Sequence, residues 1–221
     1  MKSLAIALVL GLVSCGGGSA EPSKSFLNYS TFDRSGSGVL VDSAGNPGSS
    51  WSNSVAGDGS TINWGESKET FAWDQAWVYL LGYKNPTNGI TYQQVAGEDV
   101  YCAGGLCARL PVDGRQHYAP RYPQADYTMS TVGYIVESTT GKRVNFVHWR
   151  DVKIAVPCAN PYYQNRVCLV QRELWWDDNQ TPLGLKLDRT TYYADGLGVG
   201  FTIIEQYPTQ LRLYLKDLKQ P

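Results

Sequence analysis

The sequence has few of the residues that side-chain chemistry commonly uses. It contains two histidines and two methionines among 221 residues, and its 19 Lys and Arg nearly balance 20 Asp and Glu, for a net charge of -1. Without an excess of one sign there is no uniform field to attract nucleic acid or anionic lipid. Charged residues are only 18% and hydrophobic residues 43%, which excludes a globally disordered chain.

Several motifs that are typical of enzymes are also absent. The sequence contains no GxSxG, no HExxH and no glycine-rich phosphate loop. Strand and helix patterns do not alternate as they do in nucleotide-binding folds, and no fixed-period repeat is visible. We therefore expect no cofactor and favour a protein without catalytic activity.

Aromatic and alternating segments dominate what is present. The 15 Tyr and 7 Trp favour strands over helix bundles. Apolar and polar residues alternate in several segments about ten residues apart, which is typical of antiparallel strands joined by short turns. The clearest segments are 127–137, 144–156, 167–176, 183–188, 199–203 and 211–216. The pattern predicts a mainly β domain in which meander strands form a curved sheet, a half-barrel or a sandwich.

The predicted organisation is a leader, a tether and one domain. Residues 1–14 are expected to be a signal peptide and 15–25 a flexible Gly/Ser tether, followed by a β-rich domain over 26–221. Within that domain, Gly, Ser, Asn and Asp predict a loop-rich part over 26–68, and the main sheet is expected over 69–221. A helix over 69–81 is an alternative.

The N-terminal segment carries the strongest indication of location. One lysine and an apolar run of about ten residues, too short to span a bilayer, precede Leu12-Val13-Ser14-Cys15. This ending resembles the lipobox of bacterial lipoproteins, which implies acylation (palmitate among the acyl chains) at Cys15 and anchoring in the cell envelope. The expected address is the outer membrane, facing the periplasm or the cell surface. Cleavage after Gly18-Ser19-Ala20, which would release a secreted protein, is the alternative.

A second resemblance lies near the C-terminus. The run Tyr192-Tyr193-Ala194-Asp195-Gly196-Leu197-Gly198-Val199-Gly200 is similar to a turn found in uncharacterised bacterial envelope lipoproteins, with Leu-Gly inserted here. The resemblance implies a curved antiparallel sheet and no catalytic residue. Glycines at 196, 198 and 200 would permit a tight turn or bulge.

Four cysteines remain once Cys15 is assigned to the anchor or removed with the leader. In an oxidising envelope we expect two local disulfides, Cys102–Cys107 across a hairpin tip and Cys158–Cys168 across a turn-rich loop. A four-cysteine zinc site is the alternative, but neither pair has CxxC spacing. No metal site is therefore expected.

His148 and the Asp177-Asp178 pair are the groups to which chemistry could be assigned. His148, held by Asp151 or by Glu173 on a neighbouring strand, is the basis of an alternative function as a secreted hydrolase. Asp177-Asp178 beside Trp175-Trp176 could bind Ca²⁺ or a sugar, although a solvated turn explains the same residues.

Aromatic side chains form the candidate binding site. Nine are expected on one concave sheet face, where flat rings stack on sugars or cover acyl chains: Trp73, Trp77, Tyr79, Tyr162, Tyr163, Trp175, Trp176, Tyr192 and Tyr193. For any single ring, packing in the core is the favoured explanation. The expected function is binding of a lipophilic or glycan ligand by a lipid-anchored envelope protein. The alternative is a structural or partner-docking lipoprotein, whose protein partner is unknown.

Overall fold

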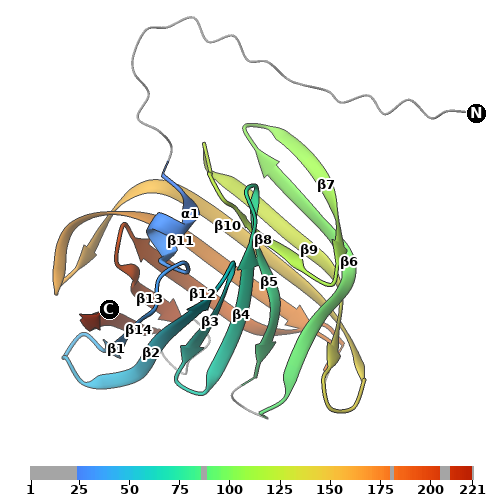
Figure 1. Ribbon diagram of the computed structural model, residues 1–221, viewed down its shortest axis with the longest axis horizontal. Helices are drawn as coiled ribbons and strands as arrows, with labels where there is room; N and C mark the ends of the chain where they lie inside the picture. The colour runs from blue at the N-terminus through green and yellow to red at the C-terminus, as the bar shows by residue number, and fades with distance from the viewer. Residues whose placement is uncertain (1–23, 86–88, 180–181, 205–209, 221) are drawn as a thin grey trace, which may run out of the picture.

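The computed structural model describes residues 24–85, 89–179, 182–204 and 210–220, with the side chains of 159, 163–165 and 199–204 excepted. One short helix, α1 (Phe26–Ser30), precedes fourteen strands (Figure 1). In the described residues no helix is long and apolar enough to cross a membrane. The strands are β1 (Gly36–Val41), β2 (Pro47–Ala56), β3 (Gly59–Trp64), β4 (Ser67–Trp73), β5 (Trp77–Lys84), β6 (Thr91–Ala103), β7 (Leu106–Asp113), β8 (Gln116–Pro120), β9 (Tyr127–Glu137), β10 (Arg143–Asn160), β11 (Tyr163–Asp177), β12 (Gly184–Ala194), β13 (Gly198–Ile204) and β14 (Leu211–Lys219).

All fourteen strands belong to one strongly curved antiparallel sheet, as the alternating pattern predicted. Its order is β7-β6-β9-β10-β11-β12-β13-β14-β1-β2-β3-β4-β5-β8. β5 and β6, each next to a terminal strand, also pair with each other at Gly82–Gln93, Tyr83–Tyr92 and Lys84–Thr91. The sheet therefore curves until its two sides touch, and it surrounds an interior that residues from nearly every strand fill (Figure 1).

The segment expected to be loop-rich is instead part of this sheet. Residues 26–68 contain α1, β1, β2, β3 and the start of β4. Small side chains there serve close packing, since a Cβ on Gly48 would lie 2.4 Å from Leu213. Large inward residues such as Trp51 supply the burial that a strand needs. The alternative of a helix over 69–81 is wrong, because that stretch forms the end of β4 and the start of β5.

An aromatic cluster packs α1 into one end of the interior. The rings of Phe26, Phe32, Phe71, Tyr118 and Tyr193 contact one another at centroid distances between 4.5 and 6.3 Å. The side-chain amide of Asn53 donates to three carbonyls in the segment after α1, those of residues 31, 32 and 34. Helix and loop therefore close this end.

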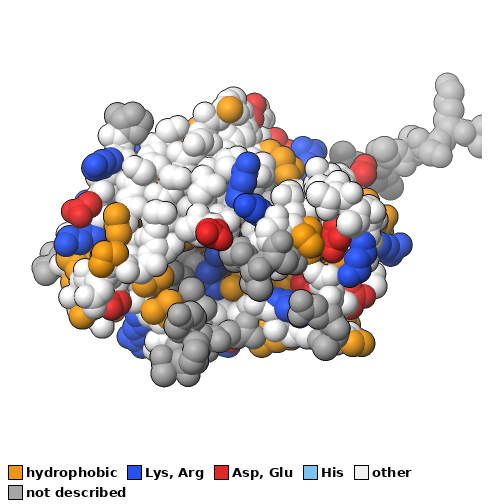
Figure 2. Space-filling view, turned by 90° about the horizontal axis from the view of Figure 1, so that it is seen from below, with side chains coloured by type: hydrophobic (Ala, Val, Ile, Leu, Met, Phe, Trp, Pro, Cys, Tyr) orange, Lys and Arg blue, Asp and Glu red, His pale blue; other side chains and the backbone are white. Residues whose placement is uncertain are grey.

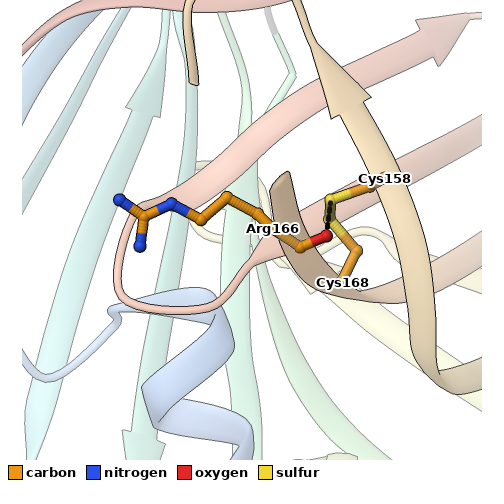
Figure 3. The surroundings of a disulfide bond; sticks show 3 residues. All are labelled: Cys158, Arg166 and Cys168. Atoms are coloured by element: carbon orange, nitrogen blue, oxygen red, sulfur yellow. Dashed lines mark hydrogen bonds between the residues drawn. A yellow bond between two sulfur atoms is a disulfide. The ribbon is translucent and has the colours of Figure 1, made fainter. Parts of the chain in front are cut away.

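Two disulfides join the cysteines in the local pairing that the sequence predicted. Cys102 and Cys107 are cross-strand partners near the tip of the β6–β7 hairpin. Cys158 and Cys168 join β10 to β11 beside the carbonyl of Arg166 (Figure 3). Because all four thiols are bonded, the zinc alternative is not supported.

Candidate functional site

A cavity of about 340 Å³ extends from Tyr118, which also contacts Phe26 of α1, toward the strand ends farther from α1. Strand β12 shows how far the outer part of the cavity lies from α1. Its Tyr193 contacts Phe26 of α1, whereas Leu187, six residues earlier, lines the cavity. Six residues of strand span about 20 Å. Figure 2 views the molecule from below and shows a hollow in this face.

The lining comes from neighbouring strands and from residues just beyond their ends. Ser67 and Glu69 belong to β4, Leu80 and Tyr83 to β5, and the remaining lining residues include Asn85, Tyr118, His148, Glu173, Trp175, Asp177, Asn179, Lys186, Leu187 and Arg189. Alternate strand residues share a face, so β11 directs residues 173, 175 and 177 inward together. The cavity wall consequently mixes charged and amide groups with aromatic and leucine side chains.

Glu173 is the centre of the hydrogen bonds at the inner end of the cavity. Its Oε2 accepts from Arg189 Nη2 at 2.8 Å and Nε at 3.1 Å, and its Oε1 accepts from the Tyr118 hydroxyl at 3.1 Å. Arg189 also reaches Glu69 Oε1 at 3.1 Å. Glu173 and Arg189 are direct cross-strand partners. The pairing of β11 with β12 therefore brings this ion pair together.

The two carboxyl groups on Arg189 have opposite pKa shifts. Burial would raise the pKa of Glu173, but the Arg189 charge and the His148 hydrogen bond outweigh it and hold that pKa far below its ordinary value. Burial and the charge of Glu173 raise the pKa of Glu69, although Arg189 opposes them. Arg189 therefore stabilises the charged form of Glu173 most strongly.

His148 lies at the wall of this cavity, with its side chain almost fully buried. Its Nε2 is 3.3 Å from Glu173 Oε1 and its Nδ1 is 2.9 Å from Gln116 Nε2. Glu173 is thus the neighbouring carboxylate that the sequence suggested, whereas Asp151 is partly exposed beside Lys153. Burial and the charge of Arg150 lower the pKa of His148 to about 4, so the ring is neutral at physiological pH.

A second hydrogen-bond network lies next to His148 and supplies partners to backbone groups of the terminal strand β8. The fully buried Arg150 donates through Nη1 to the carbonyls of His117 and Tyr118, and through Nη2 to Thr131. Asp99 accepts from the His117 amide at 2.9 Å. Side chains of β6 and β10 therefore hydrogen-bond backbone groups of β8, which is a structural role for these buried charges.

The nine candidate aromatics do not form one face. Trp73, Tyr79 and Tyr193 are buried, and Trp77 packs against Tyr101 and His117. On the outer surface Tyr162 is 39% exposed, while Trp176 and Tyr192 are half-buried. The side chain of Tyr163 lies outside the described set.

Of the nine, Trp175 lines the cavity. Its ring stacks on Phe146 at 4.6 Å and meets the edge of Tyr83 at 5.3 Å. The strands curve, so rings that lie close in sequence face different surroundings.

The Asp177-Asp178 pair makes local hydrogen bonds at the end of β11. Asp177 accepts from Trp175 Nε1 and from the Asn179 amide, both at 3.1 Å. Asp178 accepts from the backbone and side-chain amides of Asn145. No group of side chains suited to hold a metal ion is found among the described residues. These contacts match the turn interpretation, and Asp177 additionally lines the cavity.

Glu69, Arg189 and Tyr118 are the site residues that sequence reasoning missed. Glu69 and Arg189 are 120 positions apart, and only the return of the sheet upon itself brings them together. An available signal was the alternation in Leu187-Asp188-Arg189, which places a cation on the same face as an apolar residue.

Comparison of the chain with protein-family models, with curated proteins and with solved structures finds no match.

Proposed function

We propose that this protein is a lipid-anchored envelope protein that binds a small sugar-containing ligand in the cavity, without catalysis. The observation that carries the proposal is the lining itself, where the Trp175 ring and the Tyr83 ring edge lie among carboxylate, guanidinium, amide and imidazole groups. Sugars present both apolar ring faces and many hydroxyls, so such mixed walls suit them.

Of the two ligand classes suggested by sequence, the polar one fits better. An acyl chain in this cavity would remove the remaining water from Glu69 and Arg189, whose side chains are partly exposed, without supplying hydrogen bonds, which is costly. A volume of about 340 Å³ is also near the lower end of small-molecule pockets and favours a compact ligand. The cavity extends toward the strand ends farther from α1, which leaves it accessible to water-borne ligands.

The test is native mass spectrometry of protein purified from its own envelope in gentle detergent, followed by extraction and identification of whatever co-purifies. We expect a stoichiometric saccharide. Trp175→Leu should lose it, whereas the neighbouring Trp176→Leu, on the outer side of the same strand, should retain it. A co-purified lipid would contradict the sugar assignment, and an empty protein would favour the partner-docking alternative.

A further inference from the structure

Glu69 is the carboxylate of the cavity that a ligand can reach. Its side chain is 20% exposed, whereas that of Glu173 is 2% exposed. On β4 the residues that share its face are Phe71 and Trp73, which are buried in the core. Because Glu69 points inward with them and lines the cavity, its exposed surface faces the cavity.

Most of the hydrogen-bonding capacity of Glu69 is unused. A carboxylate accepts at about four positions on its two oxygens. Arg189 Nη2 donates to Oε1 at 3.1 Å. Trp64 Nε1 is the other donor near this carboxylate, but in the described part of the chain it forms no hydrogen bond of good geometry. Oε2 can therefore accept from a donor on a bound molecule.

The ion network around Glu69 carries an excess of negative charge. Glu69 and Glu173 share the Arg189 guanidinium, so the three side chains keep one negative charge when both carboxyl groups are ionised. Burial and the charge of Glu173 raise the pKa of Glu69, because Arg189 compensates this carboxylate less completely than it does Glu173. A cation placed on Glu69 would offset both effects.

The rest of the lining does not supply that cation. Asp177, which is 5% exposed, adds a second negative charge and accepts from two neutral donors, the Trp175 indole and the Asn179 amide. Lys186 lines the cavity but is exposed, so water and salt screen its charge. The cavity therefore attracts a ligand that brings its own positive charge and repels a ligand carboxylate or phosphate.

Aromatic rings adjoin Glu69 on the neighbouring strand. Glu69 and Tyr83 are direct cross-strand partners on β4 and β5, and both line the cavity. The Tyr83 ring in turn meets the Trp175 ring at 5.3 Å. Rings attract cations, and they cover the apolar faces of a sugar. An accessible carboxylate beside such rings fits a sugar that carries an ammonium group.

We infer that the cavity selects an amino sugar, whose ammonium group binds Glu69 and whose ring packs against Tyr83 and Trp175. This inference rests on the proposed function and names its ligand class. Glu69 is the specificity-determining residue in this role, and Arg189 is a positioning residue that holds its carboxylate.

The first experiment compares binding of glucosamine, glucose and ethanolamine to the wild-type protein by calorimetry at about pH 7, where most amines are protonated. Glucose has a hydroxyl where glucosamine has the ammonium, and ethanolamine has the ammonium without the sugar ring. We expect glucosamine to bind at least about tenfold more tightly than either, because a charge-assisted hydrogen bond is stronger than a neutral one and the rings need a partner.

The outcomes separate the inference from the proposed function. Equal binding of glucose and glucosamine would overturn this inference alone. Ethanolamine binding as tight as that of glucosamine would overturn the sugar class, and binding of neither sugar would overturn the proposed sugar-binding function as well.

The second experiment repeats the comparison of the two sugars with Glu69→Gln. Glutamine keeps an oxygen to which Arg189 can donate and removes the charge, so the preference for glucosamine should disappear. Glu66→Gln is the matched control, because Glu66 is exposed just before β4 and should leave the tenfold preference unchanged. A preference that survives Glu69→Gln would overturn the assignment of Glu69. The wild-type comparison tests the inference independently of how this variant folds.

Discussion

The protonation of His148 makes the free energy of unfolding depend on pH. The same ring also forms part of the cavity wall. Its folded-state pKa of about 4 lies below the ordinary 6.5 because burial and Arg150 disfavour the cation. The unfolded chain therefore takes up a proton first as the pH falls, and the folded state loses stability between 6.5 and 4. A difference of this size corresponds to a loss on the order of 3 kcal/mol.

We expect denaturant unfolding of the wild type to show this loss between pH 6.5 and 4.5, above the range where the depressed pKa of Glu173 acts in the same direction. His148→Gln cannot titrate and should have a flatter profile over that interval. Glu69, whose pKa is raised, opposes the trend in both proteins, so the difference between them isolates His148. Parallel profiles would contradict this assignment.

Arg150 is the second residue whose effect follows from burial. Arg150→Met would leave Asp99 without its nearby positive charge and two β8 carbonyls without a donor. We expect a loss of about 3–5 kcal/mol in the free energy of unfolding, as for other broken buried charge networks. Adding Asp99→Asn should recover part of it. Arg172→Met is the control, because that guanidinium is half exposed and its pair with Asp188 should contribute under about 1 kcal/mol.

At the scale of elements, the turn between β12 and β13 holds α1. Gly196 and Gly198 both have positive φ. A Cβ on Gly198 would lie 2.4 Å from Thr31 Oγ1, whereas one on Gly196 would meet nothing within 4 Å. The Gly196 amide donates to the Asn28 carbonyl in α1. The two glycines thus share a backbone conformation and differ in the space around them.

Substituting each glycine by alanine separates these two effects. Gly196→Ala should cost only the left-handed conformation, about 1–2 kcal/mol. Gly198→Ala adds a steric conflict with the end of α1 and should cost about 1–3 kcal/mol more in chemical denaturation. Equal losses would show that α1 does not pack tightly against this turn.

The two disulfides also act at the scale of elements. Each cross-links the unfolded chain and so lowers its conformational entropy. Their sequence separations are 5 and 10, for which the chain-entropy model gives about 2–3 kcal/mol each. We expect Cys158→Ser/Cys168→Ser to lower the melting temperature more than Cys102→Ser/Cys107→Ser. The loop is longer, and Cys168 is fully buried whereas Cys107 is exposed. Melting curves unchanged by reduction, with all thiols accessible, would contradict both contributions.

At the scale of the whole molecule, the two ends have different roles. Aromatic rings pack around α1 at one end, and the cavity extends toward the other, where Figure 2 shows the surface hollowed. Cys15 itself lies outside the described residues.

We expect Cys15→Ser to abolish acylation and to move the protein from the detergent-rich to the aqueous phase on partitioning. Ligand binding by the purified variant should be unchanged, because Cys15 is not among the residues that line the cavity. Mass spectrometry of the mature N-terminus provides the direct measurement. Unchanged partitioning would favour cleavage after Ala20 and a secreted protein.

Local sequence was sufficient to predict the β class, the hairpin of β9 with β10 and the pairing of the cysteines. Each depends on residues close in the chain, namely two-residue alternation, turn residues and short cysteine spacings. It did not predict the N-terminal strands, because Ser, Gly and Asn residues are typical of loops. In the structure these segments pair with and pack against neighbouring strands such as β14.

The cavity, by contrast, was decided by tertiary structure. Its ion network joins Glu69 to Arg189 across 120 positions, and Trp175 differs from Trp176 only in which face of the sheet it occupies. Strand register determines that face, and a shift of one residue would exchange the two rings. Sequence alone therefore determined which side chains were available to this protein. The curvature and register of the sheet decided which of them meet, because cross-strand pairing depends on contacts between residues far apart in the chain.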